Sequence, residues 1–178
     1  CCYNSVNRIN PTLQHIAAQK VPDFIAWEVI LVNNNSSDAT KVTAKKAWID
    51  THSTVPFQIV DEPTPGLMPA KETGINTAQY DFLLICDDDN WLDENYIRLA
   101  YEIMTNDLSI GILGGRSEAV ADIDLPFWFS TYQKAYAVGV QALKSGDLTD
   151  HGKIWGAGMI IRKSVYLKLK EIGFRHML

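Results

Sequence analysis

The sequence predicts an α/β protein whose core is a doubly wound, mostly parallel sheet flanked by helices. Three observations predict this class. Apolar strand-like runs alternate with helical patterns along the chain. The run F-L-L-I-C at residues 82–86 has no alternation of apolar and polar residues, which is typical of a strand covered on both faces. Polar clusters follow the strands, at the edge where ligands bind in such sheets.

The first part of the chain alternates between predicted strands and helices. A strand stub is expected before Tyr3, and a helix is expected to start at Asn10-Pro11, because a cap residue followed by proline favours a helix start. A second strand is predicted at 27–32, then a helix capped by residues 36–38, a third strand at 57–60 and a helix over about 70–78.

The second part begins with the fourth strand, 82–86, and an amphipathic helix that carries apolar residues at positions 97, 100, 101 and 104. The pattern changes after 110–114. An aromatic-rich connection at 122–129 leads to apolar residues at helical spacing from Tyr132 to Leu143, which are expected to pack in the core. A loop at 144–154, a strand at 159–161 and a helix from Ser164 complete the prediction.

Composition excludes several classes of protein. The 178 residues are 47% hydrophobic and 21% charged, as in ordinary globular domains, and one domain is expected. A formal charge of −5 without a basic cluster argues against a nucleic-acid binder. Three cysteines make no disulfide framework and indicate a reducing compartment, and no apolar run reaches membrane-spanning length. The chain opens on Cys1 and closes on R-H-M-L, which suggests a fragment cut at both ends.

Three consecutive carboxylates, Asp87, Asp88 and Asp89, follow the fourth strand. Like charges on one turn repel one another unless a cation or several donors compensate them. A hard divalent cation is the simplest compensation, although a solvated acidic turn or a helix cap remains open. A calcium loop of the EF-hand type does not fit, because Trp91 stands where that pattern needs an oxygen ligand.

The polar clusters are expected to converge on one rim of the sheet. They are residues 3–5 after the strand stub, 33–35 after the second strand, 62–68 after the third and 87–90 after the fourth. The carboxyl ends of parallel strands meet at the same edge, so these four loops predict a ligand site there.

Five blocks in order resemble family 2 glycosyltransferases with the GT-A fold: C-C-Y-N-S, V-N-N-N-S-S-D-A-T, E-P-T-P-G-L-M-P-A-K-E-T-G-I, L-L-I-C-D-D-D-N-W and W-G-A-G-M-I-I-R-K-S. The resemblance spans nearly the whole chain. It implies a nucleotide-binding half at 1–115 and an incomplete acceptor-side half at 116–178. It also implies an inverting transfer of sugar from a nucleoside diphosphate donor, a UDP-sugar, to an acceptor hydroxyl.

The resemblance also implies roles for particular residues. The base and ribose pocket would be lined by Cys2, Tyr3 and Asn4, and Asn33 or Asn34 would read the base edge. Asp89, with Asp88, would hold Mn²⁺ or Mg²⁺, and Asp88 could instead contact the ribose. The remaining implied contacts are Asp87 and Lys71 on the donor and Trp155, Gly156 and Ala157 on the side of the donor sugar and acceptor.

Two positions depart from the family pattern. Asn33 stands where the family often has Asp, and Lys71 stands where it usually has arginine, so a phosphate would meet a point charge without bidentate geometry. The family's general base is expected beyond Leu178, because Glu171 is the only carboxylate after Arg162 and is expected on the surface. The fragment would then bind donor and transfer little sugar. His151, before Trp155, is a further candidate on the acceptor side.

Two other functions stay open from the residues. One is a phosphotransferase of the haloacid dehalogenase kind, which also places aspartates after a buried strand. The other is a non-catalytic module that binds nucleotide sugars. The family setting implies a glycan or lipid-linked acceptor and a cytoplasmic location, at or near the cytoplasmic face of a membrane.

Overall fold

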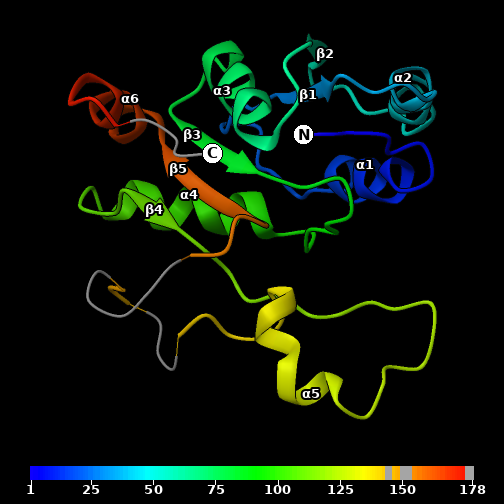
Figure 1. Cartoon of the computed structure of the whole chain (residues 1–178). Coiled ribbons are helices and arrows are strands. Elements are labelled where there is room, and N and C mark those ends of the chain that lie inside the picture. Colours follow the sequence, from blue (N-terminus) through cyan, green and yellow to red (C-terminus); the bar gives the residue numbers. More distant parts are fainter. Residues whose placement is uncertain (143–145, 149–153, 175–178) are drawn as a thin grey trace.

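The computed structural model describes residues 1–142, 146–148 and 154–174 (Figure 1). Helices and strands alternate through the first half, as the sequence predicts. The elements are α1 (Ile9–Ala17), β1 (Val29–Asn34), α2 (Thr40–Asp50), β2 (Phe57–Glu62), α3 (Leu67–Thr77), β3 (Phe82–Ile85), α4 (Tyr96–Asn106), β4 (Ile112–Leu113), α5 (Phe129–Tyr132), the 3-10 helix η1 (Gln133–Tyr136), β5 (Met159–Arg162) and α6 (Lys163–Glu171).

The strands form two hydrogen-bonded groups. β1 and β2 pair in parallel, and β5 lies between β3 and β4, antiparallel to both. Cys2 makes a parallel bridge with Asn33 of β1, which confirms the predicted strand stub. The amino group of Cys1 lies 3.3 Å from the carbonyl oxygen of Cys86, directly after β3, so the stub lies between the two groups. The reversed direction of β5 is a departure from an all-parallel order.

Helices cover both faces of these strands, as expected for a doubly wound sheet. Leu83 of β3 packs with Ile75 of α3 and Tyr166 of α6. The next residue, Leu84, packs on the opposite face with Met104 and other residues of α4. The absence of polar alternation in β3 is therefore explained by burial on two sides. A third cluster joins Cys2, α1, β1 and α2.

Two helix starts differ from the prediction. α1 begins at Ile9 rather than at Asn10-Pro11, and no side chain caps its first turn. α2 begins at Thr40, and Asp38 accepts hydrogen bonds from the Thr40 backbone N–H at 2.9 Å and from its hydroxyl. The polar run before α2 still fixes the helix start, because Asp38 satisfies a free backbone donor of the first turn.

The prediction that the aromatic region packs in the core is wrong. Phe127 is 96% exposed, and Tyr132 and Tyr136 are also exposed. The helical spacing is interrupted, because Ala137, with a φ of 56°, ends η1, and Gly139 turns the backbone again with a φ of 106°. Trp128 instead contacts Tyr132 and Tyr136 within the segment. The predicted position Leu143 and most of the predicted loop at 144–154 lie outside the described residues.

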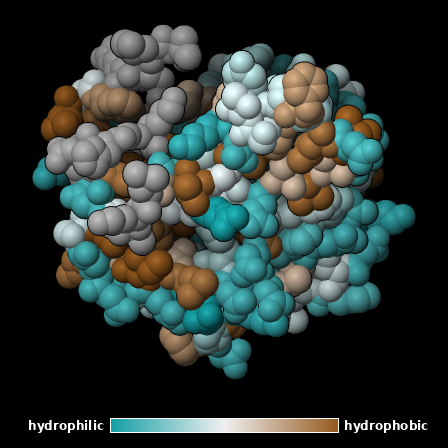
Figure 2. Space-filling view, turned by 90° about the horizontal axis from the view of Figure 1, so that it is seen from below, coloured by the Kyte–Doolittle hydropathy of each residue, from teal (hydrophilic) through white to brown (hydrophobic). Residues whose placement is uncertain are grey.

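The face on the α5 side shows apolar side chains exposed among hydrophilic ones (Figure 2). The exposed apolar and aromatic residues of this segment are Val120, Ile123, Leu125, Phe127, Trp128, Tyr132, Tyr136 and Val140. None of the helices in the described ranges is long and apolar enough to cross a membrane.

Candidate active site

The loops after Cys2, β1, β2 and β3 meet at one edge of the sheet, as the sequence predicts. The backbone N–H of Asn34, at the end of β1, donates to the carbonyl of Cys2 at 2.8 Å. Ser5 is fully buried, and its hydroxyl donates to the carboxylate of Asp88, which follows β3. The Asn34 side chain in turn holds the loop after β2, so four segments distant in sequence form one rim.

Asp88 is the most heavily engaged of the three carboxylates. Its Oδ2 accepts from the Ser5 hydroxyl and from Nη2 of Arg8 at 2.9 Å, and its carboxylate is 14% exposed. Thr12 of α1 donates to the Asp88 carbonyl at 2.8 Å. The hydrogen bond and negative charge of Asp88 raise the pKa of the Arg8 guanidinium. The protein itself therefore supplies one positive charge to the acidic turn.

Asp87 and Asp89 are less engaged. The backbone N–H of Asp87 donates to Oδ1 of Asn90 at 3.2 Å, while the side chain of Asp89, which is exposed, accepts from Nδ2 of Asn90 at 3.4 Å. Carboxylate oxygens are the ligands that Mg²⁺ and Mn²⁺ prefer. Among the described residues no three acidic, histidine or cysteine side chains converge as a complete metal site. The donor set thus fits a hard cation only with further oxygen ligands.

The two buried asparagines after β1 have different environments. Asn34 is saturated: Nδ2 donates to the carbonyls of Glu62 and Thr64 at 3.1 and 2.6 Å, and Oδ1 accepts from the Gly66 N–H at 2.9 Å. Asn33 donates from Nδ2 to Asp61 at 2.9 Å, but its Oδ1 is buried without a partner among the described residues. Oδ1 of Asn33 is therefore free to accept a hydrogen bond, whereas the Asn34 side chain holds the 62–66 loop.

Asp61 is held in place by two neighbours. It accepts from Asn33 and forms an ion pair with Lys41 of α2. The Asn33 hydrogen bond, and after it the Lys41 contacts, lower the pKa of the Asp61 carboxyl. An ionised Asp61 fixes the orientation of the Asn33 amide, because a carboxylate can only accept.

The three predicted pocket residues at the start of the chain lie at the rim in different ways. Tyr3 is 58% exposed. Asn4 has a φ of 48°, and its Oδ1 accepts from the Ser37 N–H at 2.9 Å, so it fastens the loop after β1. The Cys2 thiol is buried in the core cluster with Leu13, next to the Ser5 side chain of the rim. Burial raises the pKa of the Cys2 thiol to about 11.

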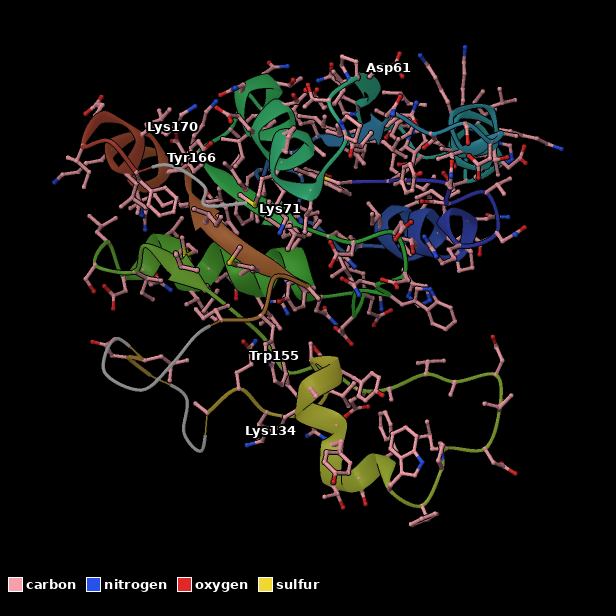
Figure 3. The ribbon with its side chains drawn as sticks, viewed as in Figure 1. Asp61, Lys71, Lys134, Trp155, Tyr166 and Lys170 are labelled. Carbon is pink, nitrogen blue, oxygen red and sulfur yellow. The ribbon has the colours of Figure 1, made fainter. Side chains whose placement is uncertain are left out.

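The turn before β5 reaches the same edge. The Gly158 N–H donates to the Ile85 carbonyl at the end of β3 at 2.9 Å. A Cβ built on Gly156 would lie 3.5 Å from Nζ of Lys71, so Lys71 and this turn are close together. Lys71 has no ion-pair partner among the described residues. Figure 3 shows Lys71 near the centre of the molecule and Asp61, near the end of β2, at its upper edge.

Trp155 is anchored through its backbone, and Ala157 lies in the same turn. The Trp155 N–H donates to Oε1 of Gln141 at 2.5 Å, and Nε2 of Gln141 donates to the Gly115 carbonyl at 2.6 Å. The predicted candidate His151 lies outside the described residues. Glu171 is exposed at the end of α6, as expected for a surface residue.

Sequence reasoning missed three residues of the site. Ser5 belongs to a noted cluster, but its burial under Asp88 has no signal in the sequence. Arg8 and Asp61 reach their partners only through the fold, since 80 residues separate Arg8 from Asp88 and 28 separate Asn33 from Asp61.

Comparison with solved structures shows which fold the chain has. The chain superimposes on the crystal structure of residues 1–349 of TarS from S. aureus with a TM-score of 0.71 and 19% identity, covering 99% of this chain and 49% of that one. It matches the mannosyltransferase PcManGT from Pyrobaculum calidifontis, solved with GDP-Man and Mn²⁺, with a TM-score of 0.66 and 20% identity, covering 97% and 44% of the two chains. The fold is that of GT-A glycosyltransferases.

The particular family follows from the sequence match. The model of "Glycosyl transferase family 2" matches residues 1–169, and the chain belongs to this family. It is 27% identical over 178 residues to the dodecaprenyl-phosphate galacturonate synthase of Rhizobium johnstonii, covering 98% of this chain and 49% of that protein. It is 24% identical over 112 residues to the glycosyltransferase GlyA of Streptococcus pneumoniae, covering 61% of this chain and 15% of that protein. The chain thus spans no more than half the length of these relatives.

Proposed function

We propose that the protein is an inverting glycosyltransferase that moves a sugar from a UDP-sugar to an acceptor hydroxyl in polysaccharide or glycan biosynthesis. The observation that carries the proposal is the rim itself, where Asp89 stays exposed beside an Asp88 fixed by Ser5 and Arg8. Membership of family 2 supports this reading over the phosphotransferase alternative. A structure of TarS contains UDP, and that of PcManGT contains GDP-Man.

Different residues of the rim would bind the base, the phosphates and the cation of the donor complex. The free Oδ1 of Asn33 would accept a hydrogen bond from the uracil imide N–H, with Tyr3 beside the base. Lys71, close to Gly156, would meet a phosphate as a point charge. Asp89, with Asp88, would hold Mn²⁺ or Mg²⁺, and Asp87 would contact the donor. Such a cation, when bound, neutralises charge that develops on the leaving diphosphate.

The acceptor and location are proposed from the relatives. One relative carries dodecaprenyl phosphate in its name, and this supports a lipid-linked acceptor. A glycan acceptor and a location at the cytoplasmic face of a membrane are further parts of the proposal. The turn with Trp155, Gly156 and Ala157 would lie on the acceptor side.

One observation favours donor binding without transfer for residues 1–178. Direct displacement needs a carboxylate that removes the proton of the acceptor hydroxyl. In the described part of the chain after β5, Glu171 is the only acidic side chain, and it is exposed at the end of α6. A module that binds nucleotide sugars is therefore the second candidate function of this chain.

Thermal shift and calorimetry with UDP, GDP and CDP, each with and without Mn²⁺, test the proposal. We expect UDP with Mn²⁺ to stabilise the protein most, and Asp89→Ala to abolish the Mn²⁺-dependent part. Asp93→Ala, a nearby exposed carboxylate of the next turn, is the matched control. Equal stabilisation of wild type and Asp89→Ala would remove Asp89 from the metal role, and no response to any nucleotide would refute the donor site.

A further inference from the structure

Asn33 of β1 and Asp61 of β2 lie directly opposite each other in the parallel pair of strands. Opposite residues point their side chains to the same face of a sheet. Nδ2 of Asn33 donates to Oδ1 of Asp61 at 2.9 Å. Asn33 is 9% exposed, and its Oδ1 is buried without a partner in the part of the chain that the structure describes. The protein therefore satisfies the nitrogen end of this amide and leaves the oxygen end unpaired.

Lys41 of α2 holds Asp61 from another side. Its Nζ donates to Oδ2 of Asp61 while Asn33 donates to Oδ1, so the two neighbours use different oxygens of one carboxylate. The Asn33 hydrogen bond, and after it the Lys41 contacts, lower the pKa of the Asp61 carboxyl, so Asp61 is ionised near neutral pH. An ammonium group can only donate and an ionised carboxylate can only accept. The hydrogen bonds from Lys41 and Asn33 to Asp61 therefore have one possible direction.

This direction decides what Asn33 offers to a ligand. A side-chain amide has a donor end and an acceptor end of nearly equal size, and a half-turn of the amide exchanges them. Because the ionised Asp61 accepts from Nδ2, only Oδ1 of Asn33 remains for a partner from outside. A buried acceptor without a partner is costly, so a ligand N–H placed at Oδ1 also removes that cost.

We propose that Asp61 is a positioning residue that sets the nucleobase preference of the donor site. It keeps the acceptor oxygen of Asn33 available, so the site binds uracil, which presents a ring N–H, in preference to cytosine, which presents an unprotonated ring nitrogen. The inference rests on the proposed function, in which Asn33 contacts the base edge. It adds a residue that does not contact the nucleotide and acts only through the Asn33 amide.

The chemistry of the two pyrimidines makes this preference strong. With cytosine, the ring nitrogen and Oδ1 of Asn33 would be two acceptors facing each other, and both would lose water without gaining a hydrogen bond. Uracil and cytosine have nearly the same size and shape. A comparison of UDP with CDP therefore separates the direction of the hydrogen bond from the fit of the ring.

Asp61→Asn tests the inference, because it should turn the Asn33 amide around. Lys41 still needs an acceptor, so the new side-chain amide would keep its oxygen on Lys41 and point its nitrogen at Asn33. Asn33 would then accept with Oδ1 and present Nδ2 to the base. We expect the ratio of the UDP and CDP dissociation constants to shift toward CDP by about tenfold or more. Titration calorimetry in the presence of Mn²⁺ measures the ratio.

Two further variants separate the orientation of the amide from charge and from stability. Asp50→Asn removes the same charge from the exposed end of α2 and should leave the ratio unchanged. Asn33→Asp, added to Asp61→Asn, should restore the preference for UDP, because a carboxylate at position 33 can only accept. The Asp61 side chain is 55% exposed, so we expect these variants to fold, and their Tm is measured beside that of the wild type.

Three outcomes would overturn the inference while UDP still binds to the wild type. One is an unchanged ratio in Asp61→Asn, and another is an equal loss of both affinities, because Asp61 would then only support the fold. The third is a ratio that Asn33→Asp fails to restore. If the folded wild type binds neither UDP nor CDP, the donor site itself is refuted, and the inference with it.

Discussion

Nη2 of Arg8 lies 2.9 Å from Oδ2 of Asp88, and the two residues are 80 positions apart in the sequence. The contact places a permanent positive charge against the acidic turn after β3. It explains how three adjacent carboxylates are tolerated by the protein alone, because Asp88, the middle one, is paired and hydrogen-bonded. The exposed Asp89 faces solvent.

Arg8→Gln should tighten the binding of Mn²⁺ alone by about threefold to tenfold, because one positive charge close to the carboxylates is removed. The cost in unfolding free energy should be about 1 kcal/mol or less, since the Arg8 side chain is 53% exposed. Titration calorimetry measures the affinity. Lys20→Gln, which breaks the exposed pair with Glu94, is the control and should leave Mn²⁺ affinity unchanged. Weaker Mn²⁺ binding in Arg8→Gln would show that Arg8 does not compete with the cation.

The two asparagines after β1 should differ in their effects. Asn34→Ala should cost about 2–4 kcal/mol of unfolding free energy, because three hydrogen bonds to the 62–66 loop are lost in a buried place. Asn33→Ala should cost about 1 kcal/mol, since it removes one hydrogen bond and an acceptor without a partner. Urea unfolding gives both values, and UDP affinity should fall in Asn33→Ala. Similar losses of stability in the two variants would contradict the view that Asn34 holds the 62–66 loop and Asn33 does not.

The protein should lose stability in acid when Asp61 becomes protonated, and its neighbours Asn33 and Lys41 should set the pH at which this happens. Its pKa is lowered in the folded protein, so its contribution to stability is present above the ordinary pKa and is lost as pH falls through the folded value. Asn33→Ala and Lys41→Ala should each raise the Asp61 pKa, because each removes a hydrogen bond that lowers it. NMR titration of the Asp61 carboxyl measures both shifts. An unchanged Asp61 pKa in Asn33→Ala would show that the Asn33 hydrogen bond does not lower it.

Gly158→Ala should destabilise the protein by about 1–3 kcal/mol. Its φ is 73°, and a Cβ there would lie 2.9 Å from the Tyr96 hydroxyl oxygen, which donates to the Gly158 carbonyl. Gly173→Ala is a matched control, because Gly173 has a φ of 86° but nothing within 4 Å of the added Cβ. Thermal unfolding of both variants separates backbone strain from the clash. Equal losses would show that Tyr96 yields without cost.

Much of the fold was predictable because its signals are local. The unbroken apolar run of β3 reflects contacts on both faces, and the polar clusters mark strand ends. The reversed direction of β5 was not predictable, because a four-residue strand with apolar side chains reads the same in either direction. The prediction that the aromatic region packs in the core was also wrong. The helical spacing of Tyr132 and Tyr136 does not reveal that the backbone turns at Ala137 and Gly139.

The sequence predicted which loops form the candidate site, but not which side chains contact one another there. The run of aspartates and the run of asparagines were visible in the sequence. Which member of each run is free depends on partners from distant segments, such as Ser5 on Asp88 and Gly66 on Asn34. These contacts distinguish Asp89 and Asn33 from otherwise identical neighbours.

Gln141 fastens together the two ends of the excursion between β4 and β5, through the Gly115 carbonyl and the Trp155 N–H. Because one side chain holds both ends, we expect the residues between them to tolerate changes in length and composition while β4 and β5 keep their places. Loop grafts between relatives are best joined at Gly115 and Trp155.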